Sequence, residues 1–148
     1  MSALPQYAPF EISKAVSAHS IALGFIKNTD GDFEFVGSFA AEVEKYFELN
    51  LVDELTFFSP TGKAGELFEI PVSATDSQTD RSFLVGVGDQ SGAAARLAGA
   101  AVGRKVRGKN TTVFSACVVA EVKSHAISIA LGAWVWNLKT DNKKEEPT

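Results

Sequence analysis

The apolar residues of this chain fall into runs that predict strands, separated by stretches with helical periodicity. Residues 19–26, 83–87 and 112–120 are almost entirely apolar. Such runs are typical of strands that are covered on both faces, and 83–87 is expected to be a central parallel strand. Residues 67–72 predict a further strand, and 55–58 form a short apolar run. The pattern therefore predicts a sheet with a buried centre.

Two stretches between these runs predict amphipathic helices. Ser38 is expected to cap the first helix, and Gly108 is expected to end the second, which spans residues 92–106. Leu97 is expected at the centre of the second helix's apolar face. The apolar faces comprise Phe39, Val43, Tyr46 and Phe47 in the first helix, and Ala94, Leu97, Ala98, Ala101 and Val102 in the second.

Strands that alternate with helices favour a sheet covered by helices. We expect strands 83–87 and 112–120 to be adjacent and parallel, joined by a right-handed crossover through the 92–106 helix. The predicted fold class is α/β, with a mixed, largely parallel sheet flanked by helices.

The end of the chain changes composition abruptly. Residues 127–138 carry a helical apolar face, whereas 139–148 contain no large apolar residue. The face comprises Ile127, Ala130, Leu131, Trp134 and Leu138. Such a shift is typical of a domain boundary. We expect one domain over residues 1–138, and the start of a linker to a further domain over 139–148.

Composition narrows the class of protein. The chain has 148 residues and a formal net charge of −4, with 45% hydrophobic and 22% charged residues, which is typical of one globular domain. The modest negative charge argues against a general nucleic-acid or anionic-membrane binder. No apolar run has the length of a membrane span, and the N-terminal residues lack the pattern of a signal peptide, so we expect a cytoplasmic protein.

Few residues suggest chemistry. Cys117 is the single cysteine, lies in an apolar run and is expected to be a buried, unreactive thiol. His19 and His125 begin a predicted strand and a predicted helix, and each is expected at the surface or at a boundary. Neither has a second histidine or cysteine nearby in sequence, which argues against a zinc site. Residues 28–32 suggest a calcium loop, but Phe33 stands where glycine is needed, and a tight turn explains the aspartate–glycine pair. No catalytic residue and no metal ligand is assigned.

The strongest candidate for a ligand site is the glycine-rich turn after strand 83–87. Gly86, Gly88 and Gly92 are candidates for an anion-binding loop at a helix N-terminus. Their spacing is GxGxxxG, whereas a dinucleotide fingerprint reads GxGxxG and has an acidic residue about 20 positions further on. A tight turn from strand to helix is the alternative explanation.

A second near match to a phosphate-binding motif is GRKVRGKN at 103–110. It departs from the P-loop because Asn110 replaces the hydroxyl residue and because the motif follows a helix instead of preceding one. Its basic residues are expected to complement the helix dipole.

Three segments, taken in order, carry a resemblance to a known family. They are GKAGE at 62–66, FLVGVG at 83–88 before an alanine-rich helix, and IALGAWVW at 129–136 before a lysine-rich tail that ends in Glu-Glu-Pro. In this order they resemble the N-terminal domain of the cytosol (leucyl) aminopeptidase family. The resemblance covers nearly the whole chain after about residue 15.

The resemblance implies a two-domain metallo-exopeptidase that removes N-terminal amino acids from peptides. This chain would have a macro-domain-like fold and a non-catalytic role in assembly or substrate access. Two divalent metal ions, zinc or manganese, would be held by a C-terminal catalytic domain, and no cofactor by this chain. The implied partners are that domain, further copies in a hexamer and, for some members, DNA.

The alternative is a binding module of another class. In that case the chain is a free-standing macro-like domain whose 86–92 loop holds a phosphorylated nucleotide such as ADP-ribose. The linker-like residues 139–148 favour the aminopeptidase, whereas a helix N-terminus facing an apolar cleft would favour the nucleotide.

Overall fold

The computed structural model describes residues 12, 15–109, 111–118, 123 and 125–130. The predicted boundary at residue 138, the 139–148 linker and most of the 127–138 helix lie outside these residues. The labelled elements, in chain order, are β1 (Ser20–Lys27), β2 (Phe33–Phe35), α2 (Phe39–Phe47), α3 (Leu51–Thr56), β3 (Leu67–Pro71), β4 (Arg81–Gly86), α4 (Gly92–Val106) and β5 (Val113–Ala116). Residues 125–130 are also helical.

Strand β1 lies at the centre of a five-stranded mixed sheet. Along one edge it pairs in parallel with β4. Along the other edge its first half pairs in parallel with β5, and its second half pairs antiparallel with β2. Strand β3 is antiparallel to β4 and forms the outer edge on that side. The α/β class and the mixed sheet are therefore confirmed.

The predicted adjacency of the strands at 83–87 and 112–120 is wrong. β4 and β5 are each parallel to β1, but β1 lies between them. The chain therefore crosses over β1 as it passes through α4. Six consecutive residues of β1 are buried, so the central position in the sheet removes the most apolar surface of this strand from water. Two of the four pairings among the described strands are parallel, which makes the sheet mixed and not largely parallel.

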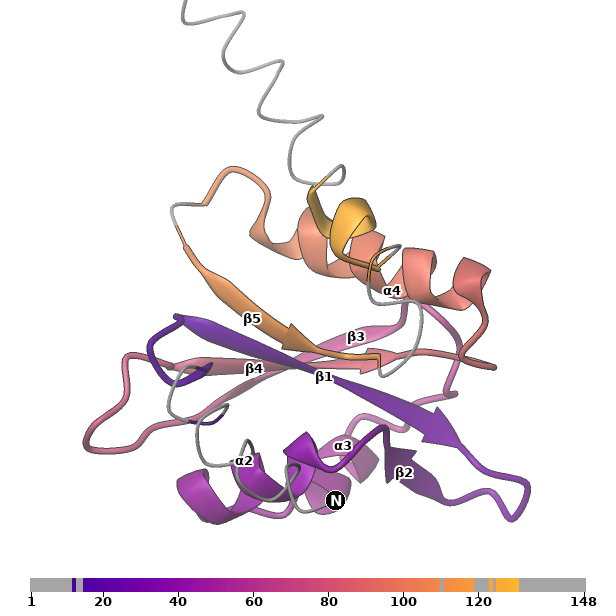
Figure 1. Cartoon of the computed structure of the whole chain (residues 1–148). Helices are drawn as coiled ribbons and strands as arrows, with labels where there is room; N and C mark the ends of the chain where they lie inside the picture. The colour runs from indigo at the N-terminus through magenta and orange to yellow at the C-terminus, as the bar shows by residue number, and fades with distance from the viewer. Residues whose placement is uncertain (1–11, 13–14, 110, 119–122, 124, 131–148) are drawn as a thin grey trace, which may run out of the picture.

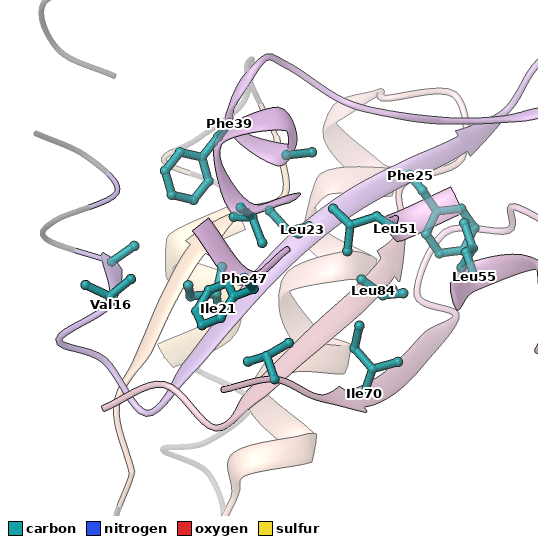
Figure 2. Close-up of a cluster of buried hydrophobic side chains, with 14 residues drawn as sticks. Val16, Ile21, Leu23, Phe25, Phe39, Phe47, Leu51, Leu55, Ile70 and Leu84 are labelled. Atoms are coloured by element: carbon teal, nitrogen blue, oxygen red, sulfur yellow. The ribbon is translucent and has the colours of Figure 1, made fainter. Parts of the chain in front are cut away.

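Helices cover both faces of the sheet (Figure 1). Helices α2 and α3 pack on one face, where Phe39, Leu51 and Leu55 meet Ile21 and Leu84 in one buried cluster (Figure 2). On the other face, α4 and residues 125–130 cover a second cluster. That cluster comprises Ala22, Val36, Phe83, Val85, Val87, Ala98, Val102 and Cys117. No helix among the described residues has the length and apolar character that a membrane span requires.

Helix α4 begins and ends where the sequence predicts, but it is rotated. Its buried residues are Ala94, Ala95, Ala98, Gly99, Ala101, Val102 and Gly103. Leu97, expected at the centre of the buried face, is 53% exposed. A Cβ added at Gly99 would lie only 2.4 Å from the carbonyl oxygen of His125. Because the neighbouring backbone approaches this closely, only small side chains and Val102 fit on the buried face.

Two elements differ from the predictions, and two are new. Ser38 precedes α2 as expected, but its side chain makes no capping hydrogen bond. The strand expected over 112–120 is shorter, with β5 ending at Ala116. The run at 55–58 belongs partly to helix α3, which Asn50 caps by accepting the Asp53 N–H at 3.0 Å. The predicted turn at 28–32 leads into β2, a strand that the pattern did not reveal.

Truncating two residues of α4 tests the observed rotation. Val102→Ala should destabilise the domain by about 2 kcal/mol, because Val102 is fully buried. Leu97→Ala should change the free energy of unfolding by less than about 0.5 kcal/mol, since half of its surface already meets solvent. Urea unfolding of both variants measures the difference. If Leu97→Ala lost more stability than Val102→Ala, the helix would have Leu97 on its buried face, as the sequence predicts.

Candidate functional site

The glycine-rich turn joins the end of β4 to the start of α4. Gly86 is the last residue of β4 and Gly92 the first of α4. Ser91 caps the helix, because its hydroxyl oxygen accepts the Ala94 N–H at 3.1 Å. Within the turn, the Gln90 N–H donates to the Val87 carbonyl at 2.9 Å. The turn is therefore closed by its own hydrogen bonds, as a strand-to-helix connection requires.

Residues 61–66, here named the covering loop, lie directly on this turn. The Gly65 N–H donates to the Gly86 carbonyl at 2.9 Å, and the Gly86 N–H donates to the Glu66 carbonyl at 2.7 Å. A Cβ at Gly86 would lie 2.2 Å from the Lys63 carbonyl oxygen, and one at Gly88 would lie 3.2 Å from the Ala64 Cβ. Glycine is therefore needed at both positions because the covering loop lies too close to leave room for a side chain. Two of the segments that carry the family resemblance are thus in contact.

The Glu66 carboxylate organises the covering loop. It accepts the N–H groups of Thr61 and Gly62, each within 2.9 Å, and the Thr61 hydroxyl at 3.2 Å. Gly62 has a φ of 88° and packs against Lys27, the last residue of β1. The covering loop thus spans the C-terminal ends of β1 and β4. Ligands of open α/β sheets usually bind at this end of the strands, and here the chain itself occupies it.

Asp89 places a negative charge beside the N-terminus of α4. Its carboxylate accepts the Ser91 N–H at 3.0 Å. Hydrogen bonds from the side chain and backbone of Ser91 hold the pKa of Asp89 below its usual value. The ionised carboxylate complements the helix dipole and repels a second anion. The surroundings of Gly86, Gly88 and Gly92 therefore do not favour a phosphate.

A polar pair of the buried His125 and the half-buried Ser115 links β5 to the C-terminal helix. The Nε2 atom of His125 lies 2.7 Å from the Ser115 hydroxyl, and Nδ1 lies 3.0 Å from the Ala95 carbonyl oxygen. A carbonyl only accepts, so Nδ1 carries the proton and Nε2 accepts the Ser115 hydroxyl. His125 is 3% exposed, and this burial lowers its pKa. The prediction of a surface or boundary histidine is therefore wrong.

The close contact at Gly99 explains why His125 is buried. Because Gly99 has no side chain, the backbone at His125 can lie directly against α4. The His125 imidazole then fits between α4 and β5. A serine hydroxyl held by a neutral imidazole resembles part of a nucleophilic pair. Both imidazole nitrogens are engaged, one with β5 and one with α4, and this favours a structural role in which His125 holds the C-terminal helix to these two elements. One signal was available in the sequence: Ser115 is the single polar residue inside an apolar strand run.

The other candidate residues are accounted for by local structure. Cys117 is fully buried, as expected, and burial raises the pKa of its thiol to about 12, which favours an unreactive cysteine. His19 is exposed, and its Nδ1 accepts the Thr112 N–H at 3.2 Å. Asn28 Oδ1 accepts the N–H groups of Asp30 and Asp32, each at 3.0 Å. Within the described part of the chain, no three His, Cys, Asp or Glu side chains gather as a metal site would require.

The basic residues near position 103–110 lie at the end of α4 and the turn after it. Arg104 and Lys105 are in the last helical turn, where they complement the dipole as expected. Lys105 also reaches β3, where its Nζ lies 2.8 Å from the Glu69 carboxylate. These residues therefore border the outer edge of the sheet.

Comparison with known proteins does not identify a family for this chain. The chain matches no protein-family model, and it matches no curated protein sequence. The site must therefore be interpreted from its own contacts.

Acid should destabilise the domain through His125. Its pKa is about 6.5 when unfolded and lower when folded, so the unfolded chain binds the proton more readily. The stability that neutral His125 provides is complete above pH 6.5 and is lost as the pH falls through the folded pKa. Urea unfolding at pH 7.0 and pH 5.5 should show a larger loss for the wild type than for His125→Asn. Equal losses in the two proteins would contradict this role for His125.

Proposed function

We propose that this chain is the non-catalytic domain of a metal-dependent aminopeptidase, with a role in assembly or in substrate access. The observation that carries the proposal is the contact between the covering loop and the 86–92 turn. These two segments also carry the family resemblance, and together they fill the end of the sheet where an α/β fold would hold a small ligand. A closed ligand site favours a structural domain over a nucleotide-binding one.

The layered arrangement is compatible with the macro-domain-like fold that the resemblance implies. It has a mixed sheet with helices on both faces (Figure 1). In the proposed parent enzyme the partners are the catalytic domain and further copies of the same protein. The catalytic domain would hold the two zinc or manganese ions, which would supply Lewis-acid chemistry for peptide hydrolysis.

The ADP-ribose alternative requires the 86–92 turn to accept a diphosphate. Two features count against it. The covering loop lies within hydrogen-bonding distance of Gly86, and the Asp89 carboxylate lies beside the start of α4. A nucleotide would have to displace the first and overcome repulsion from the second.

Capture of the native protein tests the proposal. An antibody raised against this chain should capture a polypeptide larger than 15.8 kDa that hydrolyses leucine p-nitroanilide. A chelator should abolish the activity, and zinc or manganese should restore it, because metal-assisted hydrolysis needs the bound ion. The isolated chain should show no turnover with either metal.

Two results would count against this assignment. A captured polypeptide of 15.8 kDa without peptidase activity would contradict the two-domain proposal. Calorimetric titration of the isolated chain with ADP-ribose should give no heat of binding. Micromolar binding that is lost on substitution of Gly88 by alanine would support the nucleotide module instead.

A further inference from the structure

The outer edge of β3 is open among the described strands. In the sheet order β3 is terminal and pairs only with β4. Hydrogen bonds from Gly86 N–H to the Glu66 carbonyl and from Val72 N–H to the Asp80 carbonyl fix the phase of this pairing. In an antiparallel ladder the bonded residues alternate. Positions 68 and 70 therefore bond to β4, and positions 67, 69 and 71 turn their backbone groups away from it.

These outward groups form a template for one short added strand. Leu67 and Glu69 each offer an N–H and a carbonyl, and Pro71 offers a carbonyl alone. Edge strands with unpaired backbone groups bind extended polypeptides by adding a strand to the sheet. Proline lacks an N–H, so pairing is strongest at the Leu67 end of β3.

On one side of this edge lies a group of aromatic rings, here named the aromatic shelf. It consists of Phe57, Phe58 and Phe68. The Phe58 ring stacks on Phe68 with centroids 4.8 Å apart, and Phe57 meets Phe58 edge to face at 6.0 Å. Phe57 is 86% exposed. A large exposed aromatic side chain in contact with neighbouring rings is typical of a binding surface.

On the other side of the edge the charge is positive. The Glu69 carboxylate is bonded to both Lys105 and Arg81, and these cations hold its pKa below the usual value. Arg104 is exposed and forms none of the ion pairs found among the described residues. Together with Leu67, these α4 cations line a shallow cavity of about 360 Å³.

The positive charge is concentrated at the Leu67 end of β3. At the Pro71 end, Asp80 lies 3.9 Å from Arg81 and offsets it. At the Leu67 end, the cavity is lined by Arg104 and Lys105, and of these two cations only Lys105 is in an ion pair found among the described residues, the one with Glu69. The end with the better backbone template is therefore also the more cationic end.

Side chains of an added strand alternate between these two sides. We propose that the β3 edge binds an extended polypeptide segment in which acidic residues alternate with apolar or aromatic residues. The apolar side chains pack on the aromatic shelf, and the acidic ones face Arg104 and Lys105. The backbone pairs with Leu67 and Glu69. This inference is independent of the proposed aminopeptidase function.

A short synthetic peptide tests the proposal directly. A fluorescein-labelled peptide of sequence EFELEF should bind the chain in an anisotropy titration. A KFKLKF peptide should bind at least about tenfold more weakly, because its charges repel the α4 cations. Of two EFELEF isomers methylated at alternate backbone nitrogens, one should bind like the parent and the other should not, since only one loses the N–H groups that face β3.

Matched variants locate the binding surface. Phe57→Ser should weaken EFELEF binding about tenfold, as expected for an exposed aromatic anchor. Ile127→Ser is the control, because Ile127 is also exposed, at 49%, but belongs to the C-terminal helix, which lies on the face of the sheet opposite to the aromatic shelf. Arg104→Glu should weaken EFELEF and improve KFKLKF. Circular dichroism verifies that each variant is folded.

Amide exchange supplies the decisive measurement. Saturating EFELEF should slow exchange at Leu67 and Glu69, whereas Phe68 and Ile70 are already protected by β4. Binding that leaves Leu67 and Glu69 unprotected, or that treats both methylated isomers and KFKLKF alike, would overturn the proposal. A concentration-dependent dimer that Phe57→Ser abolishes, with no peptide binding, would assign the edge to a second copy and would also overturn it.

Discussion

The arrangement of the sheet depends on a close backbone contact at Gly24. Strand β1 changes partner at this residue, from β5 to β2. The Gly24 carbonyl accepts the Val36 N–H at 2.9 Å, while a Cβ on Gly24 would lie 2.0 Å from the Cys117 carbonyl oxygen. Any side chain here would push β5 away from β1. The same contact sets the position of β5, and with it the Ser115 hydroxyl that anchors His125.

Local pattern predicted most of the elements, including the five-residue strand β3, and missed the helix α3 and the strand β2. The bounds of β1 were placed within a residue, and those of α4 were placed correctly, because each carries a long periodic signal. Helix α3 has six residues and β2 has three, too few for a period to be visible. The order of strands lay beyond local pattern, since the place of β1 between β4 and β5 follows from competition for burial.

The candidate site shows the same limit more sharply. The sequence marked Gly86 and Gly88 as special, but the reason lies about 20 residues earlier in the chain, in the covering loop. Likewise, Leu97 is exposed and His125 is buried because of one missing side chain at Gly99. A glycine in a sequence signals a close approach, but it does not say whether the approaching group is a ligand or the protein's own backbone.

Closing the strand ends shifts the surfaces available for binding to the side of the sheet. In an open α/β sheet the C-terminal ends of parallel strands usually carry the ligand. Here the Glu66 carboxylate fixes the covering loop over β1 and β4, so the loop occupies the position where a ligand would bind. The β3 edge has no such cover among the described residues. Its unpaired backbone groups lie between the exposed Phe57 ring and the exposed Arg104, and such groups are a template for pairing with another polypeptide.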